Sequence, residues 1–157
     1  KALKEQYSAI EEGKADILGL YLVTKLYDMD ELTEGDVMDN FVTFMAGIFR
    51  SVRFGVSSSH GKANMIRFYY FREHGAFNRD EKTGVYSIDF EKMKKAMETL
   101  AREILIIQGD GNYEAAKKLV EEKGYIRNML KKDLQRIEDA GIPVDIRFEQ
   151  GLNVIGL

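Results

Sequence analysis

Proline is almost absent from this sequence, whose 157 residues contain a single one, Pro143. Proline lacks an amide hydrogen and its ring clashes with the preceding turn, so its near absence leaves long stretches free to form uninterrupted helices. In these stretches apolar residues recur at the spacing of an amphipathic helix, as Phe41, Met45 and Ile48 do. The sequence therefore predicts a mainly α protein, a multi-helical lobe that folds as a single domain over residues 1–157.

Turn residues and capping residues divide the chain into six expected helices. Thr33, three positions before Asp36, is the expected N-cap of the second helix. A turn around Lys82 to Gly84 separates two short extended runs and favours a small β-hairpin. Residues 144–148, VDIRF, alternate apolar and polar side chains and predict a short C-terminal strand or extended arm. The expected helices run from about Leu3 to Tyr27, from Val37 to Val52, from His60 to Glu73, from Phe90 to the QGDGN stretch, from Tyr113 to Lys123 and from Ile126 to Ala140.

Two of these helices carry specific predictions about burial. From Ile17 to Val23 only Gly19 interrupts large apolar residues, and a helix that is apolar on all sides is buried on all sides. We therefore expect the first helix to be enclosed. The fourth helix is expected to bury one face made of Met93, Met97, Leu100, Ala101, Ile104 and Leu105.

Composition excludes several classes of function. The formal net charge is −3, and acids and bases are interspersed, so the sequence predicts no basic surface for nucleic acid. No apolar run approaches the roughly 20 residues that span a bilayer, so no membrane partner is expected. Without cysteine there is no disulfide and no thiolate metal site, and we expect a cytoplasmic location. Because Lys1 is not an initiator methionine and helical composition begins at once, we expect a piece of a longer protein.

Three acids, Glu11, Glu12 and Asp16, stand at the start of the apolar part of the first helix. Glu12 and Asp16 share one helix face, whereas Glu11 lies about 100° around the axis from Glu12. An ionised carboxylate in apolar surroundings is unfavourable unless a cation, a metal or hydrogen bonds compensate it. Two interpretations are open: a solvated helix end in which the acids pair with Lys14, or acids that face a metal ion.

The segment EEGKAD followed by GLYL resembles the EExxAD/E segment of the dipeptidyl peptidase III-like zinc peptidases. In that family an HExxGH helix supplies two histidine ligands and the second Glu of this segment supplies the third. The resemblance implies that Glu12 is a zinc ligand, with Glu11 and Asp16 in the outer shell that orients the histidines. A carboxylate ligand supported by further acids is typical of zinc sites.

The stretch FGVSSSHGKA resembles the family region whose histidine reaches the scissile carbonyl, which implies that His60 is the matching catalytic residue. At a helix N-terminus the imidazolium is disfavoured, so a neutral imidazole could donate to a developing oxyanion. A solvated loop histidine is the other interpretation. We expect no chemistry from His74, and we interpret Arg53 and Arg67 as ordinary salt-bridging residues.

The chain contains neither HExxGH nor HExxH, so both histidine ligands and the general base of such a peptidase are missing. The resemblance therefore implies the C-terminal part of a zinc exopeptidase that releases dipeptides from the N-terminus of short peptides. Its partners would be a short peptide and the remainder of its own chain, and zinc would bind only in the full-length protein. The fragment alone would be inactive. Some family members carry a Nudix domain further upstream.

The alternative hypothesis is a non-catalytic α-helical protein-interaction module. In it the acids would form a wet helix end, and the aromatic residues Phe68, Tyr69, Tyr70 and Phe71 would line a groove for a partner. An HExxGH motif within about a hundred residues upstream of Lys1 would favour the peptidase, because the ligand set would then be complete.

Overall fold

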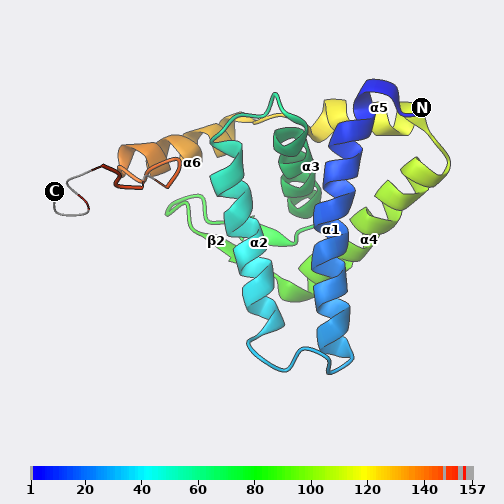
Figure 1. Ribbon diagram of the computed structural model, residues 1–157, viewed down its shortest axis with the longest axis horizontal. Coiled ribbons are helices and arrows are strands. Elements are labelled where there is room, and N and C mark those ends of the chain that lie inside the picture. The colour runs from blue at the N-terminus through cyan, green and yellow to red at the C-terminus, as the bar shows by residue number, and fades with distance from the viewer. Residues whose placement is uncertain (1, 147, 152–153, 155–157) are drawn as a thin grey trace.

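The computed structural model describes residues 2–146, 148–151 and 154. These residues form a mainly α fold with one small β-hairpin, as the sequence predicts (Figure 1). A 3₁₀ turn, Lys4–Gln6, leads into the first helix. The helices are α1 (Tyr7–Asp28), α2 (Val37–Val52), α3 (Ser59–Glu73), α4 (Phe90–Gly109), α5 (Tyr113–Lys123) and α6 (Asn128–Asp139), and the strands are β1 (Phe77–Arg79) and β2 (Tyr86–Ile88).

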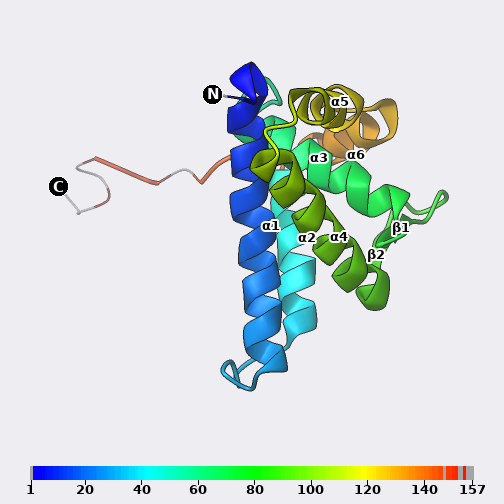
Figure 2. The same ribbon diagram turned by 90° about the vertical axis from the view of Figure 1, so that its right-hand side faces the viewer.

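Helix α3 is the centre of the fold, since it contacts α1, α2, α4, α5 and β1 (Figures 1 and 2). Every residue from Ala63 to Phe71 is buried, including Asn64 and Arg67. The sequence pointed to α1 as the enclosed helix, and this prediction is wrong. Helix α1 buries one stripe that includes Ile10 and Ile17, while Leu22 on another side is 58% exposed.

The burial of α3 also removes the groove of the interaction-module hypothesis. Phe68, Tyr69 and Phe71 are fully buried and Tyr70 is 6% exposed, so these rings form core rather than a surface for a partner. Phe68 and Phe49 of α2 meet edge to face at 5.7 Å between ring centroids, a favoured arrangement for aromatic rings. These four aromatic side chains therefore stabilise the domain itself.

The second and fourth helices follow their predicted stripes, with two corrections. Helix α2 buries Phe41, Met45, Ile48 and Val52 as expected. Its N-cap is Asp36 rather than Thr33, because the Asp36 carboxylate accepts a 2.8 Å hydrogen bond from the amide of Met38. In α4 the buried face is confirmed except at Leu105, which is 46% exposed. Leu105 lies about 100° around the helix axis from Ile104, beyond the edge of the buried face.

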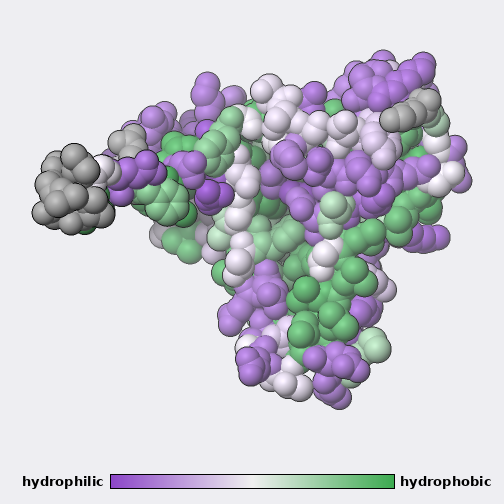
Figure 3. Space-filling view, in the orientation of Figure 1, coloured by the Kyte–Doolittle hydropathy of each residue, from purple (hydrophilic) through white to green (hydrophobic). Residues whose placement is uncertain are grey.

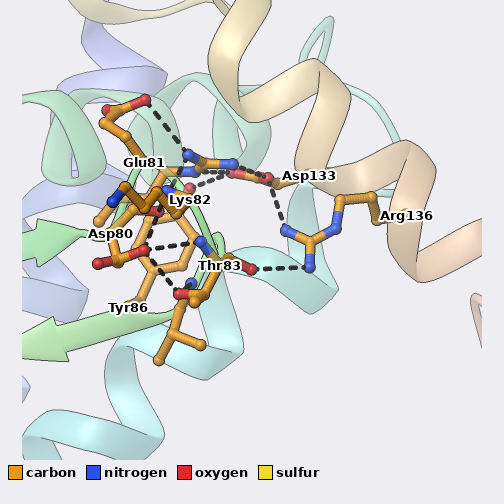
Figure 4. A network of polar contacts seen from close by, with 9 residues as sticks. Asp80, Glu81, Lys82, Thr83, Tyr86, Asp133 and Arg136 are labelled. Carbon is orange, nitrogen blue, oxygen red and sulfur yellow. Dashed lines mark hydrogen bonds and ion pairs between the residues drawn. The ribbon is translucent and has the colours of Figure 1, made fainter.

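The hairpin is confirmed, with β1 and β2 antiparallel and Phe77 opposite Ile88. A polar network attaches it to α6 (Figure 4). Arg79 donates two hydrogen bonds of 2.7 Å to the two oxygens of Asp133, and the hydroxyl of Tyr86 donates a third at 2.6 Å. Arg136 adds a 3.3 Å bond to the same carboxylate. The carboxylate is thus paired and hydrogen-bonded, which is what a charge that is only 5% exposed requires.

From Ala140 to Ile146 the chain continues beyond α6 as an arm with turns and bends. In the described part of residues 144–148 there is no strand, and Arg147 lies outside the described residues. The arm is held against α2, because Arg53 donates to the carbonyl oxygens of Ile142 and Pro143 and Arg50 pairs with Asp145 at 3.1 Å. Among the residues that the structure describes, Arg53 thus binds carbonyl groups and pairs with no acid, in contrast to the salt bridge expected from the sequence. Among the described residues no helix is long and apolar enough to cross a membrane.

Candidate functional site

The predicted site residues lie where the N-terminal half of α1 packs against the first turns of α3. Glu12 and Asp16 are four positions apart on α1, and His60, Asn64 and Arg67 follow one another at spacings of four and three on α3. Residues at such spacings share a helix face. The two faces meet, because Glu12 contacts His60 and Asp16 contacts Arg67.

Glu12 and His60 form the exposed end of this contact. Nδ1 of His60 lies 3.1 Å from Oε2 of Glu12, and the side chains are 72% and 36% exposed, respectively. In the described part of the chain Glu12 pairs with no lysine or arginine, and its Oε1 has no hydrogen-bond partner. The sequence singled out both residues, and the structure brings them together on one surface.

Asp16 and Arg67 form the inner end of the contact. Nη1 of Arg67 lies 2.6 Å from Oδ2 of Asp16, and Nη2 donates a 2.7 Å hydrogen bond to the amide oxygen of Asn64. Burial lowers the pKa of the Arg67 guanidinium, while the negative charges of Asp16 and Glu12 act to raise it. Arg67 is salt-bridging, as expected, but it is 2% exposed and therefore no ordinary surface arginine.

Glu11 faces a different neighbour. Nζ of Lys14 donates to its carboxylate at 2.9 Å, and the side chain of Gln108 in α4 donates to it at 2.6 Å. These hydrogen bonds, from Lys14 first and then Gln108, hold the pKa of Glu11 below its ordinary value. Its place on the helix, turned away from Glu12, agrees with the 100° separation expected from the sequence. Its role in an outer shell remains a prediction.

The backbone before α3 fixes where His60 begins the helix. The hydroxyl of Ser58 accepts a 3.1 Å hydrogen bond from the amide of Gly61 and caps the helix. Gly61 is required by close packing, because an added Cβ would lie 2.6 Å from Cα of Val56 and still closer to the carbonyl oxygen of Gly55. The loop at Gly55 and Val56 therefore presses directly on the first turn of α3, next to His60.

The glycines near the acids differ in how closely other residues approach them. At Gly13 an added Cβ would meet Cδ1 of Ile104 at 3.6 Å and Cβ of Ala63 at 3.9 Å, which are ordinary contacts. At Gly19 nothing described lies within 4 Å. His74 caps the other end of α3 and stacks on Tyr70 at 4.1 Å between ring centroids, far along the helix from His60.

The described residues contain no group of three or more His, Cys, Asp or Glu side chains that could hold a metal ion. Catalytic zinc takes three protein ligands and an open position. Glu12 and His60 provide two adjacent donors, so this part of the chain can supply a share of a zinc site and not the whole of it. Sequence reasoning did not single out Asn64, although it lies four positions from His60, as Asp16 does from Glu12, and it treated the inward-facing Arg67 as an ordinary salt-bridging residue.

Comparison with solved structures places this geometry in a known fold. The structure of dipeptidyl peptidase III from Caldithrix abyssi matches with a TM-score of 0.88 and 38% identity, over 93% of this chain and 28% of that one. Dipeptidyl peptidase III from Corallococcus sp. strain EGB matches with a TM-score of 0.84 and 32% identity, over 94% of this chain and 27% of that one. The chain has a dipeptidyl peptidase III-like fold. It spans little more than a quarter of the length of either enzyme.

A curated relative carries a different name. "Nudix hydrolase 3" from Arabidopsis thaliana is 42% identical over 146 residues, which are 93% of this chain and 19% of the plant protein. That name belongs to a protein of which the shared segment is about a fifth, so it assigns no Nudix activity to these residues. No family model matches the sequence.

Proposed function

We propose that this chain is the C-terminal, metal-contributing segment of a zinc-dependent dipeptidyl peptidase III-like exopeptidase. The full-length protein would release dipeptides from the N-terminus of short peptides in the cytoplasm. The observation that carries the proposal is that the three acids have different partners. Asp16 is paired with Arg67 and Glu11 with Lys14, whereas Glu12, within the described residues, faces only the imidazole of His60.

The donor chemistry fits one ligand of a zinc site. Glu12 is partly exposed, and one of its oxygens is unengaged in the described structure, so it can bind a cation that other residues also reach. Two further protein ligands are needed. They and the general base would come from an HExxGH motif in the remainder of the polypeptide, which would act as the partner of this segment. When bound, zinc supplies a Lewis acid that polarises a peptide carbonyl and makes a water molecule more acidic.

In this proposal the side chains of this segment bind the metal and orient the substrate. Glu12 would hold the metal, and its Oε2, 3.1 Å from Nδ1, orients the ring of His60. With Nδ1 donating to Glu12, the ring must also carry a proton on its other nitrogen to donate to the carbonyl oxygen of the scissile peptide. His60 would therefore act as an imidazolium and not as the neutral imidazole expected from the sequence. Asp16 and Glu11 lie outside the metal ligands. Alone, the segment lacks the base and two ligands and is inactive.

The exposed surface of α1 favours the interpretation that another part of the polypeptide packs against the outer side of this helix. Figure 3 shows hydrophilic residues over the N-terminal half of α1 and apolar residues over its C-terminal half. Leu22 is 58% and Leu26 is 39% exposed there, and a hollow of about 690 Å³ between α1 and α4 is lined by Leu18, Tyr21, Leu105 and Ile106 among others. The hollow is also lined by Glu98, Arg102 and Asp110, and exposed apolar area that polar residues surround is typical of an interface. We propose that the remainder of the same polypeptide packs against this apolar surface.

The test uses the full-length protein that carries this segment. Glu12→Ala should lower both its zinc content, measured by elemental analysis, and its turnover of short peptides. His60→Ala should retain zinc and lose turnover, which separates substrate contact from metal binding. Glu31→Ala, in an exposed loop, is the matched control and should change neither.

Two results would refute the proposal. One is a Glu12→Ala protein that keeps the full zinc content, since a catalytic zinc does not survive loss of one of three ligands unchanged. The other is the absence of an HExxGH motif from the complete reading frame. A His60→Ala protein without zinc would instead move His60 from substrate contact to metal binding.

A further inference from the structure

Arg67 is a buried cation whose position is fixed on several sides. It is 2% exposed, and its guanidinium lies 5.4 Å from the centroid of the Phe44 ring. One end of the guanidinium meets Asp16 and the other meets Asn64. Its Nε is buried with no hydrogen-bond partner among the described residues. Packing and pairing therefore allow this side chain little freedom.

Asn64 connects Arg67 to His60. The amide nitrogen of Asn64 donates a 3.0 Å hydrogen bond to the carbonyl oxygen of His60, while its amide oxygen accepts from Arg67. A guanidinium has donors only, so Arg67 determines which way the amide of Asn64 points. The contacts form a chain from Asp16 through Arg67 and Asn64 to the backbone of His60, parallel to the contact between Glu12 and His60.

Asp16 is held differently from Glu12. Its side chain is 49% exposed, one oxygen lies against Arg67, and the other oxygen has no partner among the described residues. A half-exposed carboxylate without such a pair would be free to rotate and to compete for a nearby cation. Paired with an immobile guanidinium, it presents its second oxygen from a fixed position, one turn from Glu12.

We propose that Arg67 is a positioning residue for the metal site. It engages one oxygen of Asp16, so that Glu12 is the carboxylate that binds the metal and the second oxygen of Asp16 accepts a hydrogen bond from one of the other ligands. Residues that orient metal ligands in this way contribute strongly to metal affinity. This inference rests on the proposed function, because it requires that Glu12 binds zinc.

A purely structural role for the same pair predicts different behaviour. If Arg67 only stabilises the packing of α1 on α3, its removal lowers stability and leaves the zinc affinity of the folded protein unchanged. If Arg67 acts through Asp16, removing either residue weakens zinc binding by a similar factor, and removing both is no worse than removing one. The comparison of single and double variants therefore distinguishes the two roles.

The experiment measures zinc affinity of the full-length protein by competition with a chromophoric chelator, together with thermal unfolding. The variants are Asp16→Asn, Arg67→Met and the double variant, and the control is Arg72→Met, which removes an exposed arginine from the same helix. We expect a loss of about 10- to 100-fold in zinc affinity in all three test variants, of similar size in each. The control should bind zinc like the unmodified protein.

Zinc affinity within a few-fold of the unmodified protein in Arg67→Met would overturn the inference, as would losses that multiply in the double variant. Should Arg67→Met fail to fold, the double variant decides, because it leaves neither charge unpaired: unchanged zinc affinity there also overturns the role of Arg67. Glu12→Gln, measured alongside, distinguishes failure of the proposed function from failure of the positioning role of Arg67. If that variant keeps its zinc, the proposed function itself has failed; if it loses zinc while the Arg67 variants do not, only the positioning role has failed.

Discussion

Asp133 of α6 and Arg79 of β1 are joined by two parallel hydrogen bonds of 2.7 Å, so that the hairpin and the last helix share one buried ion pair. The hydrogen bonds of Arg79, assisted by the hydroxyl of Tyr86, lower the pKa of Asp133 to about 2. Paired charges of opposite sign in bidentate geometry are among the stronger polar contacts in proteins.

This pair predicts how stability depends on pH. The pKa of Asp133 is lower in the folded chain than the value of about 3.9 expected when unfolded, so its contribution is present above pH 4 and is lost as the pH falls towards 2. The contribution is about 2 kcal/mol. Urea unfolding between pH 6 and pH 2 should show the unmodified chain losing about that much more stability than Asp133→Asn. If the free energies of unfolding of the two proteins differ by the same amount at every pH in this range, the low pKa assigned to Asp133 is contradicted.

The pair of Asp16 and Arg67 predicts an asymmetry between its two members. Asp16→Asn leaves a cation that is 2% exposed without its counter-charge, which costs about 3 kcal/mol or more. Arg67→Met leaves a carboxylate that is 49% exposed and that water can solvate, so we expect a smaller loss of about 1–2 kcal/mol.

Urea unfolding of the two variants measures this difference. Glu121→Gln, which breaks the exposed pair with Lys117, is the control and should cost less than about 0.5 kcal/mol. A larger loss for Arg67→Met than for Asp16→Asn would mean that packing of the arginine stem outweighs its charge.

Helices such as α2 and α4 could be predicted from the sequence because each buries one stripe, and the spacing of a stripe is visible in the sequence itself. The centre of the fold could not. The run from Ile17 to Val23 is more apolar than α3, which carries Asn64 and Arg67, yet α3 is the buried helix. Arg67 can be buried because Asp16, on another helix, neutralises it. A pairing between helices leaves no mark in the apolar pattern of either one.

The sequence allowed the residues of the candidate site to be predicted, but only some of the contacts between them. Glu12 and His60 stood out by their neighbours in sequence, and the structure places them 3.1 Å apart. Their contact comes from the packing of α1 on α3, in which a Cβ at Gly13 would lie 3.9 Å from Cβ of Ala63. The partners of Glu11 could be foreseen only in part, because Lys14 is on the same helix but Gln108 comes from α4.

Gly61 should be intolerant of substitution. A Cβ at this position would meet the backbone of Gly55 and Val56, which cannot move aside as a flexible side chain would. We expect Gly61→Ala to cost about 1–3 kcal/mol in urea unfolding, the range of overpacked sites. Gly13→Ala is the control: its Cβ would make ordinary contacts at 3.6 and 3.9 Å and should gain up to about 1 kcal/mol of helix propensity. Equal effects of the two substitutions would argue against close packing at Gly61.

Gly19 tests whether another part of the polypeptide covers α1. Nothing described lies within 4 Å of a Cβ added there, and the same is true of Gly47 in α2. In the 157-residue chain, alanine at either position should therefore stabilise its helix by about 0.8–1 kcal/mol, because alanine has the higher helix propensity.

In the full-length protein the gain in stability from Gly19→Ala should shrink or reverse if a further element packs against this side of α1. Urea unfolding of both alanine variants in both proteins supplies the comparison, with Gly47→Ala as the reference for propensity alone. If the Gly19→Ala gain is as large in the full-length protein as in the shorter chain, no element packs closely at Gly19, and the apolar residues near Leu22 need another explanation.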